Sequence, residues 1–315
     1  MSQTHIVLAT TALAGCVVSA DNLASVEQAD GIMPNGVSAN GIMPNGIMPN
    51  GIMPNGIMPN GIMPNGIMPN DIRLNGIMPN GIMPNGTVVG ISGIGAPLTG
   101  DAIVGSTWTG LLSDGTTLTI RVDQGVQQTG ANADLWSYRF STPVNGEWRS
   151  LCATAVGDPT FADTVSGTWN LAQGVPGGGS YHPNTAEFTI ACRGSAIAKC
   201  VELGYKPWTG NERELASCVR ALRADYCGNG TPYTVDGTLV NLFDSAGLQT
   251  DEADWDAEAE WTPEGARCIS KKTETRFWQV LHTKPTCYPN ALKTKKSCGT
   301  GFSEGAAIIT ELQPR

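Results

Sequence analysis

The residues of this chain with the clearest chemistry are its nine cysteines. Cys16 stands alone near the start, and the other eight follow residue 150: Cys152, Cys192, Cys200, Cys218, Cys227, Cys268, Cys287 and Cys298. An even set of this kind is typical of disulfides in an exported protein, although spacing alone does not choose the connectivity. No pair has the Cys-x-x-Cys spacing that places two thiolates around one zinc ion. We therefore expect disulfides among these eight cysteines and no metal bound to them.

Residues suited to acid and base catalysis are few. His182 and His282 are the histidines beyond the N-terminal segment, and no Gly-x-Ser-x-Gly elbow accompanies either. We expect His182, next to a glycine-rich stretch, to be an exposed loop residue. Asp225, Asp236 and Asp244 could supply a catalytic carboxylate pair or, alternatively, oxygen ligands for Ca²⁺. Because these acids lie near glycine turns, hydrogen bonds to turn amides compete with both interpretations.

The overall charge excludes one class of partner. The net charge is -9 and the pI about 4.8, and no basic stripe interleaved with aromatic residues is present, so we expect no nucleic-acid partner. The short basic run at 293–296 is expected to be a solvated loop. The acidic tract at 251–261 alternates acids with Ala and Trp, which predicts an exposed edge with Trp255 and Trp261 tucked in.

The sequence beyond the repeats predicts mainly short strands, which must position these residues. Alternating β-type residues occur at 103–108, 116–122, 135–140 and 186–191, separated by Gly, Asp and Asn turns. The pattern predicts an α+β domain with an antiparallel sheet or small sandwich. The glycine-rich stretch at 176–180 is expected to be a mobile loop between sheet edges.

Two short helices are predicted between the strands. The first runs from about Ser195 to Leu203 and ends at Gly204, and the second begins at Asn211, where Glu214 completes a capping-box spacing. In the second helix an apolar stripe at i, i+3, i+4 and i+7 includes Cys218. A disulfide from Cys218 to Cys200 would join the helices, with Cys192 and Cys227 as competing partners.

A repeated pentapeptide fills residues 31–85. Nine of its eleven pentads are Gly-Ile-Met-Pro-Asn. A period of five matches neither a helix nor a strand, and a proline in each pentad disfavours both, whereas Met-Pro-Asn-Gly is typical of a turn. We interpret the array as a disordered, extensible spacer similar in logic to elastin-like pentapeptides. A β-solenoid like the pentapeptide-repeat proteins and a methionine-rich Cu(I) tract are the alternatives.

The N-terminus indicates export. The apolar segment at 6–14 has the length of a signal-peptide core and ends in Leu-Ala-Gly-Cys16, which resembles the lipobox of bacterial lipoproteins. That resemblance implies cleavage before Cys16 and a lipid on its thiol, which would hold the protein on a membrane without a transmembrane helix. The five residues before the apolar core contain no Lys or Arg, unlike most signal peptides.

Longer motifs beyond the array carry a family resemblance. The stretches at 191–208, 223–230 and 233–237, with Ala224-Asp225-Tyr226-Cys227 at their centre, resemble the ADYC domain family of bacterial proteins. The resemblance implies an exported, often lipid-anchored protein with no established biochemical activity. Where the family pattern has a His three residues before the helix cysteine, this chain has Leu215.

These observations divide the chain into five parts. They are a signal peptide at 1–15, a linker at 16–30, the array at 31–85, a glycine-rich linker at 86–100 and the ADYC-like domain at 101–315. The leading functional hypothesis is a non-enzymatic lipoprotein of the cell envelope or cell surface that binds or scaffolds a protein or glycan. The alternatives are a lipid-anchored hydrolase or carbohydrate-active enzyme that uses the candidate acids, and an elastic structural protein.

Overall fold

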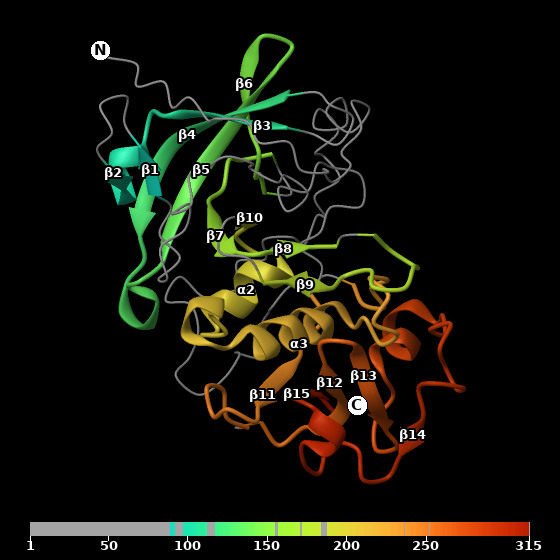
Figure 1. The fold of residues 1–315 in the computed structure, drawn as a ribbon. Coiled ribbons are helices and arrows are strands. Elements are labelled where there is room, and N and C mark those ends of the chain that lie inside the picture. Colours follow the sequence, from blue (N-terminus) through green and yellow to red (C-terminus); the bar gives the residue numbers. More distant parts are fainter. Residues whose placement is uncertain are drawn as a thin grey trace.

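A computed structural model describes residues 89–91, 97–111, 117–154, 157–170, 172–183, 188–235, 237–251 and 253–314. Cys16, the pentapeptide array and Asp236 lie outside these residues. Figure 1 shows two β-sheets with two α-helices lying between them. The predicted α+β class, with antiparallel sheets and two short helices, is confirmed.

The first sheet has the strand order β10-β7-β5-β4-β3, and β6 pairs with β5. Its strands are β3 (Thr107–Leu111), β4 (Thr117–Gln127), β5 (Trp136–Val144), β6 (Glu147–Ser150), β7 (Ala162–Ser166) and β10 (Phe188–Cys192). Three of the four predicted strands overlap β4, β5 and β10. The remaining strand, predicted at 103–108, corresponds to β3 but begins too early. Residues 100–103 form a 3-10 turn (η3, Gly100–Ile103), and Gly105 has a φ of 85°.

The second sheet has the order β11-β15-β12-β13-β14 and is antiparallel except for the β13–β14 pair. Its strands are β11 (Asn241–Asp244), β12 (Asp256–Thr262), β13 (Gly265–Ser270), β14 (Thr294–Lys295) and β15 (Ile308–Leu312). The acidic tract is not a sheet edge, because β12 is the central strand. Trp261 is buried as expected, and Asp251 and Asp254, which precede the strand, are exposed. Glu258 and Glu260 of β12 are buried with partners: Glu258 pairs with Arg276, and Glu260 accepts the backbone N–H groups of Gly299 and Ser303.

The helix α2 (Ala196–Glu202) begins and ends close to the predicted positions, and α3 (Glu212–Arg223) begins where it was predicted to begin. The Ser195 hydroxyl accepts the backbone N–H of Ala198 at 3.3 Å, which caps α2. The predicted stripe of α3 is buried throughout. The predicted capping box is absent, because the Asn211 side chain donates to the Thr209 hydroxyl instead. Both helices therefore owe their place mainly to the packing of their buried faces.

Shorter elements complete the description. They are β1 (Val89–Ile91) and β2 (Pro97–Thr99), which pair inside the predicted linker, β8 (Thr168–Trp169), β9 (Tyr181–His182), η4 (Gly130–Asn132), η5 (Pro207–Thr209), η7 (Ser303–Gly305) and one turn of π-helix, η6 (Phe277–Leu281).

The glycine-rich stretch is not a free loop: Gly178 and Gly179 are buried. A Cβ on Gly178 would lie 2.4 Å from the carbonyl oxygen of Asn229, so only glycine permits this approach.

Four disulfides join the eight cysteines beyond residue 150, as expected from their number. They are Cys152–Cys192, Cys200–Cys218, Cys227–Cys287 and Cys268–Cys298. The predicted bond between α2 and α3 is the second of these. Disulfides persist in oxidising compartments, so this set indicates an extracytoplasmic environment.

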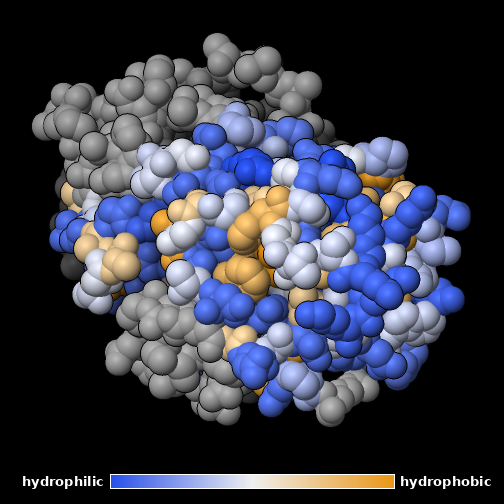
Figure 2. Space-filling model, turned by 90° about the horizontal axis from the view of Figure 1, so that it is seen from below, coloured by the Kyte–Doolittle hydropathy of each residue, from blue (hydrophilic) through white to orange (hydrophobic). Residues whose placement is uncertain are grey.

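The surface mixes hydrophilic and apolar residues. Figure 2 shows a lower face that is largely hydrophilic, with a smaller apolar area near its middle. Two exposed large apolar side chains, Trp278 and Leu281, lie on the single π-helical turn η6. No helix among the described residues is long and apolar enough to cross a bilayer.

Candidate functional site

The four residues of the signature, 224–227, form the end of α3 and the turn after it. Ala224 closes the helix in the left-handed conformation, with a φ of 51°, and is fully buried. Asp225 is 1% exposed and accepts hydrogen bonds from Arg220 Nη1 and from the backbone N–H groups of Asn229 and Gly230. Such a carboxylate stabilises the turn that follows the helix. Its burial leaves no access for a substrate.

We expect Asp225→Asn to lower the stability of the domain. The substitution removes the negative charge beside Arg220 and replaces an acceptor oxygen with a donor, while Arg220 keeps hydrogen bonds to the carbonyl oxygens of Pro263 and Gly178. Charge-assisted hydrogen bonds each contribute about 2 kcal/mol, which is the expected decrease in unfolding free energy. Urea denaturation measures it. An unchanged midpoint together with loss of a catalytic activity would instead make Asp225 an active-site residue.

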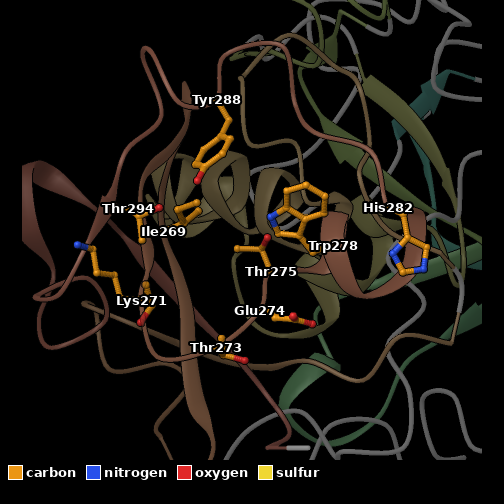
Figure 3. Close-up of a pocket in the computed structure, with 10 residues that line it drawn as sticks. Ile269, Lys271, Thr273, Glu274, Thr275, Trp278, His282, Tyr288 and Thr294 are labelled. Atoms are coloured by element: carbon orange, nitrogen blue, oxygen red, sulfur yellow. The ribbon is translucent and has the colours of Figure 1, made fainter.

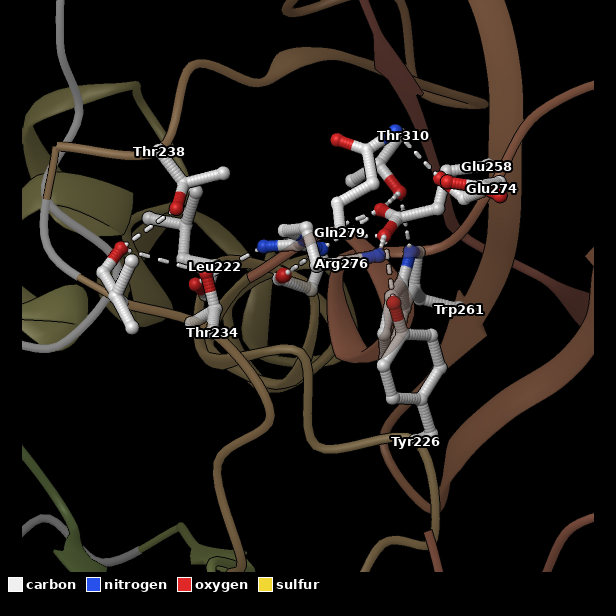
Figure 4. Close-up of polar contacts among 12 residues, drawn as sticks. Leu222, Tyr226, Thr234, Thr238, Glu258, Trp261, Glu274, Arg276, Gln279 and Thr310 are labelled. Carbon is white, nitrogen blue, oxygen red and sulfur yellow. Dashed lines mark hydrogen bonds and ion pairs between the residues drawn. The ribbon is translucent and has the colours of Figure 1, made fainter. Parts of the chain in front are cut away.

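Tyr226 connects the signature to the second sheet. Its hydroxyl donates to Glu258 Oε1 at 2.6 Å, and its ring meets Phe277 edge to face at a centroid distance of 5.2 Å. Figure 4 shows Glu258 surrounded by Tyr226, Arg276 and Thr310. Burial alone would raise the pKa of Glu258, but the Arg276 guanidinium holds it below its usual value. Arg276 directly precedes η6, so Tyr226 and Glu258 together fix the start of that turn.

Cys227 fixes the segment that follows η6. Its disulfide to Cys287 spans 60 residues of sequence, and its sulfur also accepts the backbone N–H of Cys287 at 3.2 Å. The next residue, Tyr288, packs against Phe277 at a centroid distance of 5.8 Å. The signature therefore holds two consecutive segments, one carrying Trp278 and one carrying Tyr288, against the same core.

An open pocket of about 530 Å³ lies where these segments meet the end of β13. Figure 3 shows the rings of Trp278 and Tyr288 on two sides of it, with Thr275 between them and Lys271, Glu274 and His282 farther out. The size falls in the usual range for small-molecule sites. A concave site with exposed aromatic rings and several polar groups is suited to binding.

Two polar features give this pocket directional chemistry. Thr275 is 2% exposed, and its buried hydroxyl oxygen has no hydrogen-bond partner among the described residues. The ammonium group of Lys284 lies 5.0 Å from the ring centroid of Trp278 and 5.9 Å from that of Tyr288. An unpaired buried hydroxyl is unfavourable, so a ligand that bonds to it would be favoured.

The histidine and aspartates predicted from the sequence lie elsewhere. His182 Nε2 is 3.0 Å from the Ser180 hydroxyl, but that hydroxyl lies 2.7 Å from the carbonyl oxygen of Gly177 and donates to it. The Ser180 proton is therefore directed at the Gly177 carbonyl oxygen and not at the His182 ring, as a serine nucleophile activated by a histidine base would require. Asp244 accepts three backbone N–H groups and the Tyr205 hydroxyl, which occupy its lone pairs.

The described residues offer one group of possible metal ligands, formed by Glu260, Cys268 and Cys298. The two cysteines are joined in a disulfide, and Glu260 is already bonded to Gly299 and Ser303. No thiolate is left there to bind a metal. Asp225 and Asp244, proposed as Ca²⁺ ligands, are each occupied in separate turns by the hydrogen bonds given above.

Sequence reasoning missed the pocket. Trp278, Tyr288 and Thr275 show no catalytic motif, and their meeting depends on the Cys227–Cys287 pairing, which spacing left open. One signal was present: 265–300 contains eight of the chain's 19 Lys and Arg residues and a single acid, Glu274. In an acidic chain, such a concentration of positive charge indicates a surface with its own role.

A scan against protein families matched the model of the ADYC domain over residues 100–275. A search of curated proteins found no match, and a search of solved structures also found none. The matched segment contains the signature, Glu258 and one wall of the pocket. Trp278 and Tyr288 lie beyond its end.

Proposed function

Since the chain belongs to the ADYC domain family, we propose that it is a cell-envelope lipoprotein whose disulfide-bonded domain binds a ligand in the pocket beside Trp278. One observation carries the proposal: Ala224, Asp225 and Tyr226 are buried, and Tyr226 and Cys227 hold the two segments that bear Trp278 and Tyr288. A signature that supports a pocket is expected of a binding domain. The proposal does not require any residue of the signature to react.

The remaining parts of the chain would present this domain. Cys16 would carry the lipid, and the array at 31–85 would separate the membrane from the pocket. As a flexible coil, 55 residues have an end-to-end distance of about 40 Å. A pocket held at this distance could reach a protein or glycan in the surrounding envelope.

The runner-up is a lipid-anchored hydrolase or carbohydrate-active enzyme. It has less support, because the described candidate acids are occupied by turn amides and His182 receives no proton from Ser180. The pocket does contain Glu274 and His282, but none of the described residues adds a second carboxylate to its lining. An acid and base pair for glycoside hydrolysis would need two.

Co-sedimentation with envelope fragments tests the binding function. We expect the full chain carrying Cys16→Ser, which lacks the lipid site, to bind fragments saturably, and Trp278→Ala in that background to reduce affinity at least tenfold. Trp148→Ala is the matched control. Trp148 lies in β6, is 40% exposed and, like Trp278, has a cationic side chain over its ring, that of Arg121. Equal binding by all three chains, or release of soluble products from the fragments, would refute the proposal.

The same preparation tests the anchor. With Cys16 intact, the chain is expected in the membrane fraction and to take up a labelled fatty acid, whereas Cys16→Ser is expected in the soluble fraction without label. Labelling that persists in the variant would place the lipid elsewhere.

A further inference from the structure

We infer that the pocket beside Trp278 binds an acidic saccharide, a sugar ring bearing a carboxylate or a phosphate. The inference rests on the proposed binding function and adds the ligand class. It draws on three independent features of the pocket: its aromatic rings, its hydroxyl groups and the charge of the surrounding chain.

The aromatic rings favour a flat, amphipathic ligand. Trp278 is 36% exposed although it belongs to a well-packed turn, and its neighbour Phe277 is fully buried. Pyranose rings present one face of C–H groups, which packs against an indole, while their hydroxyl groups project around the edge. Trp278 with Tyr288 offers the apolar surface for that face, in the concave setting typical of small-ligand sites (Figure 3).

The hydroxyl groups favour a ligand with many donors and acceptors. Thr273, Thr275 and Thr294 line the pocket, and the buried hydroxyl oxygen of Thr275 has no hydrogen-bond partner among the described residues. Figure 3 shows the Thr275 oxygen directed toward Trp278. A sugar hydroxyl can both donate to and accept from such a group, whereas an apolar ligand would leave it unpaired.

The charge of the surrounding segment favours an anion. Lys271 lines the pocket, Lys272 is the next residue in the chain, and Lys284 lies over both aromatic rings. Among the described residues none of these three lysines forms an ion pair. By contrast, Arg276 is buried against Glu258, and Lys295 pairs with Glu304. Lys271 and Lys284, which form no ion pair among the described residues, would attract an acidic group to the pocket, and Lys284 would repel a cationic ligand from the rings.

Neutral sugars and nucleic acids fit less well. A neutral sugar would use the rings and the threonines but would leave the lysines without a partner. A nucleic acid would need a longer basic track than this pocket provides on a chain of net charge -9. The carboxylate of Glu274, which also lines the pocket, can accept hydrogen bonds from the hydroxyl groups of a sugar.

Calorimetric titration tests the ligand class with the full chain carrying Cys16→Ser. The probes are an oligogalacturonate, a phosphorylated oligosaccharide and a neutral oligosaccharide of equal length. We expect at least one acidic probe to bind at least tenfold more tightly than the neutral one, and its affinity to fall as salt concentration rises. The comparison of the two acidic probes identifies whether carboxylate or phosphate is preferred.

Variants locate the site. Trp278→Ala should weaken the acidic probe at least tenfold, Lys271→Gln and Lys284→Gln should reduce the preference for acid over neutral, and Trp148→Ala should change neither. Circular dichroism establishes that each variant is folded. Equal affinity for acidic and neutral probes, or unchanged binding in Trp278→Ala and Lys284→Gln, would overturn the inference. If envelope fragments bind through Trp278 but no acidic probe competes, the ligand class is wrong while the binding function stands.

Discussion

Arg276→Met is expected to lower the unfolding free energy by about 3–5 kcal/mol, among the largest effects of a single substitution in this domain. Arg276 and Glu258 are both fully buried, with 2.8 Å between Arg276 Nη2 and Glu258 Oε2. Removing the guanidinium leaves the Glu258 carboxylate without its counter-charge in a region that water does not reach. It also removes donors to the carbonyl oxygens of Ala221 and Leu222. Urea denaturation at neutral pH measures the loss.

A double-mutant cycle separates the charge effect from packing. Adding Glu258→Gln to Arg276→Met removes the uncompensated charge, so the double variant should be less destabilised than the sum of the two single variants. The surface pair of Lys295 and Glu304 is the control, because a pair exposed to solvent contributes little, and Glu304→Gln should leave the midpoint unchanged. Simple additivity in the buried cycle would show that the two side chains are not coupled.

This network gives the signature a structural explanation. Ala224 closes a helix, Asp225 holds a turn, Tyr226 reaches the buried ion pair and Cys227 is half of a disulfide. The side chains of Asp225, Tyr226 and Cys227 are each explained by their own contact. The signature therefore locates a folding element, and the surface chemistry lies on the segments that the element holds.

The helices were predictable because their signals are local. Ser195 and Gly204 lie directly at the two ends of α2, and four positions suffice to identify the apolar stripe of α3. The disulfide between Cys200 and Cys218 was one of the pairings that the helices allowed, and the structure contains it. The start of β3 was missed because a glycine turn interrupts an apparently continuous β-type run.

The buried acids were not predictable in the same way. Glu258 lies in a tract that alternates charge with small and aromatic residues, which is typical of a solvated edge. Its burial depends on Arg276, whose side chain reaches it only after β13 and the following loop have folded back. The pocket has the same origin, because Trp278 and Tyr288 meet through long-range contacts to Tyr226 and Cys227.

A second buried acid makes the stability depend on pH. Asp163, in β7, is fully buried, and its Oδ1 accepts the Ser137 hydroxyl while its Oδ2 has no hydrogen-bond partner among the described residues. Burial, reinforced by the neighbouring Glu202 carboxylate, raises the pKa of Asp163 to about 8. Burial also raises the pKa of Glu202. The folded domain therefore retains protons that the unfolded chain has already released.

The sign of the pH effect follows from this difference. Between about pH 4 and pH 8 the folded state binds more protons than the unfolded state, so stability falls as the pH rises. Below that range Glu258, whose pKa is lowered, gives the opposite slope, because its ion pair with Arg276 is lost on protonation. We expect the melting temperature to be highest near about pH 4 and lower at pH 8.

Asp163→Asn should remove the alkaline slope. Asn keeps an oxygen that can accept the Ser137 hydroxyl but cannot ionise, so the variant should be more stable than wild type at pH 8, by roughly 5 kcal/mol at most. Near pH 4 and below, where Asp163 is protonated in the folded state and largely protonated in the unfolded chain, the two proteins should melt within a few degrees of each other. Asp158→Asn, which changes an exposed carboxylate, should keep the wild-type slope. Melting temperatures measured from pH 4 to pH 9 test this prediction. If the melting temperature declines in parallel in wild type and Asp163→Asn, other groups cause the slope.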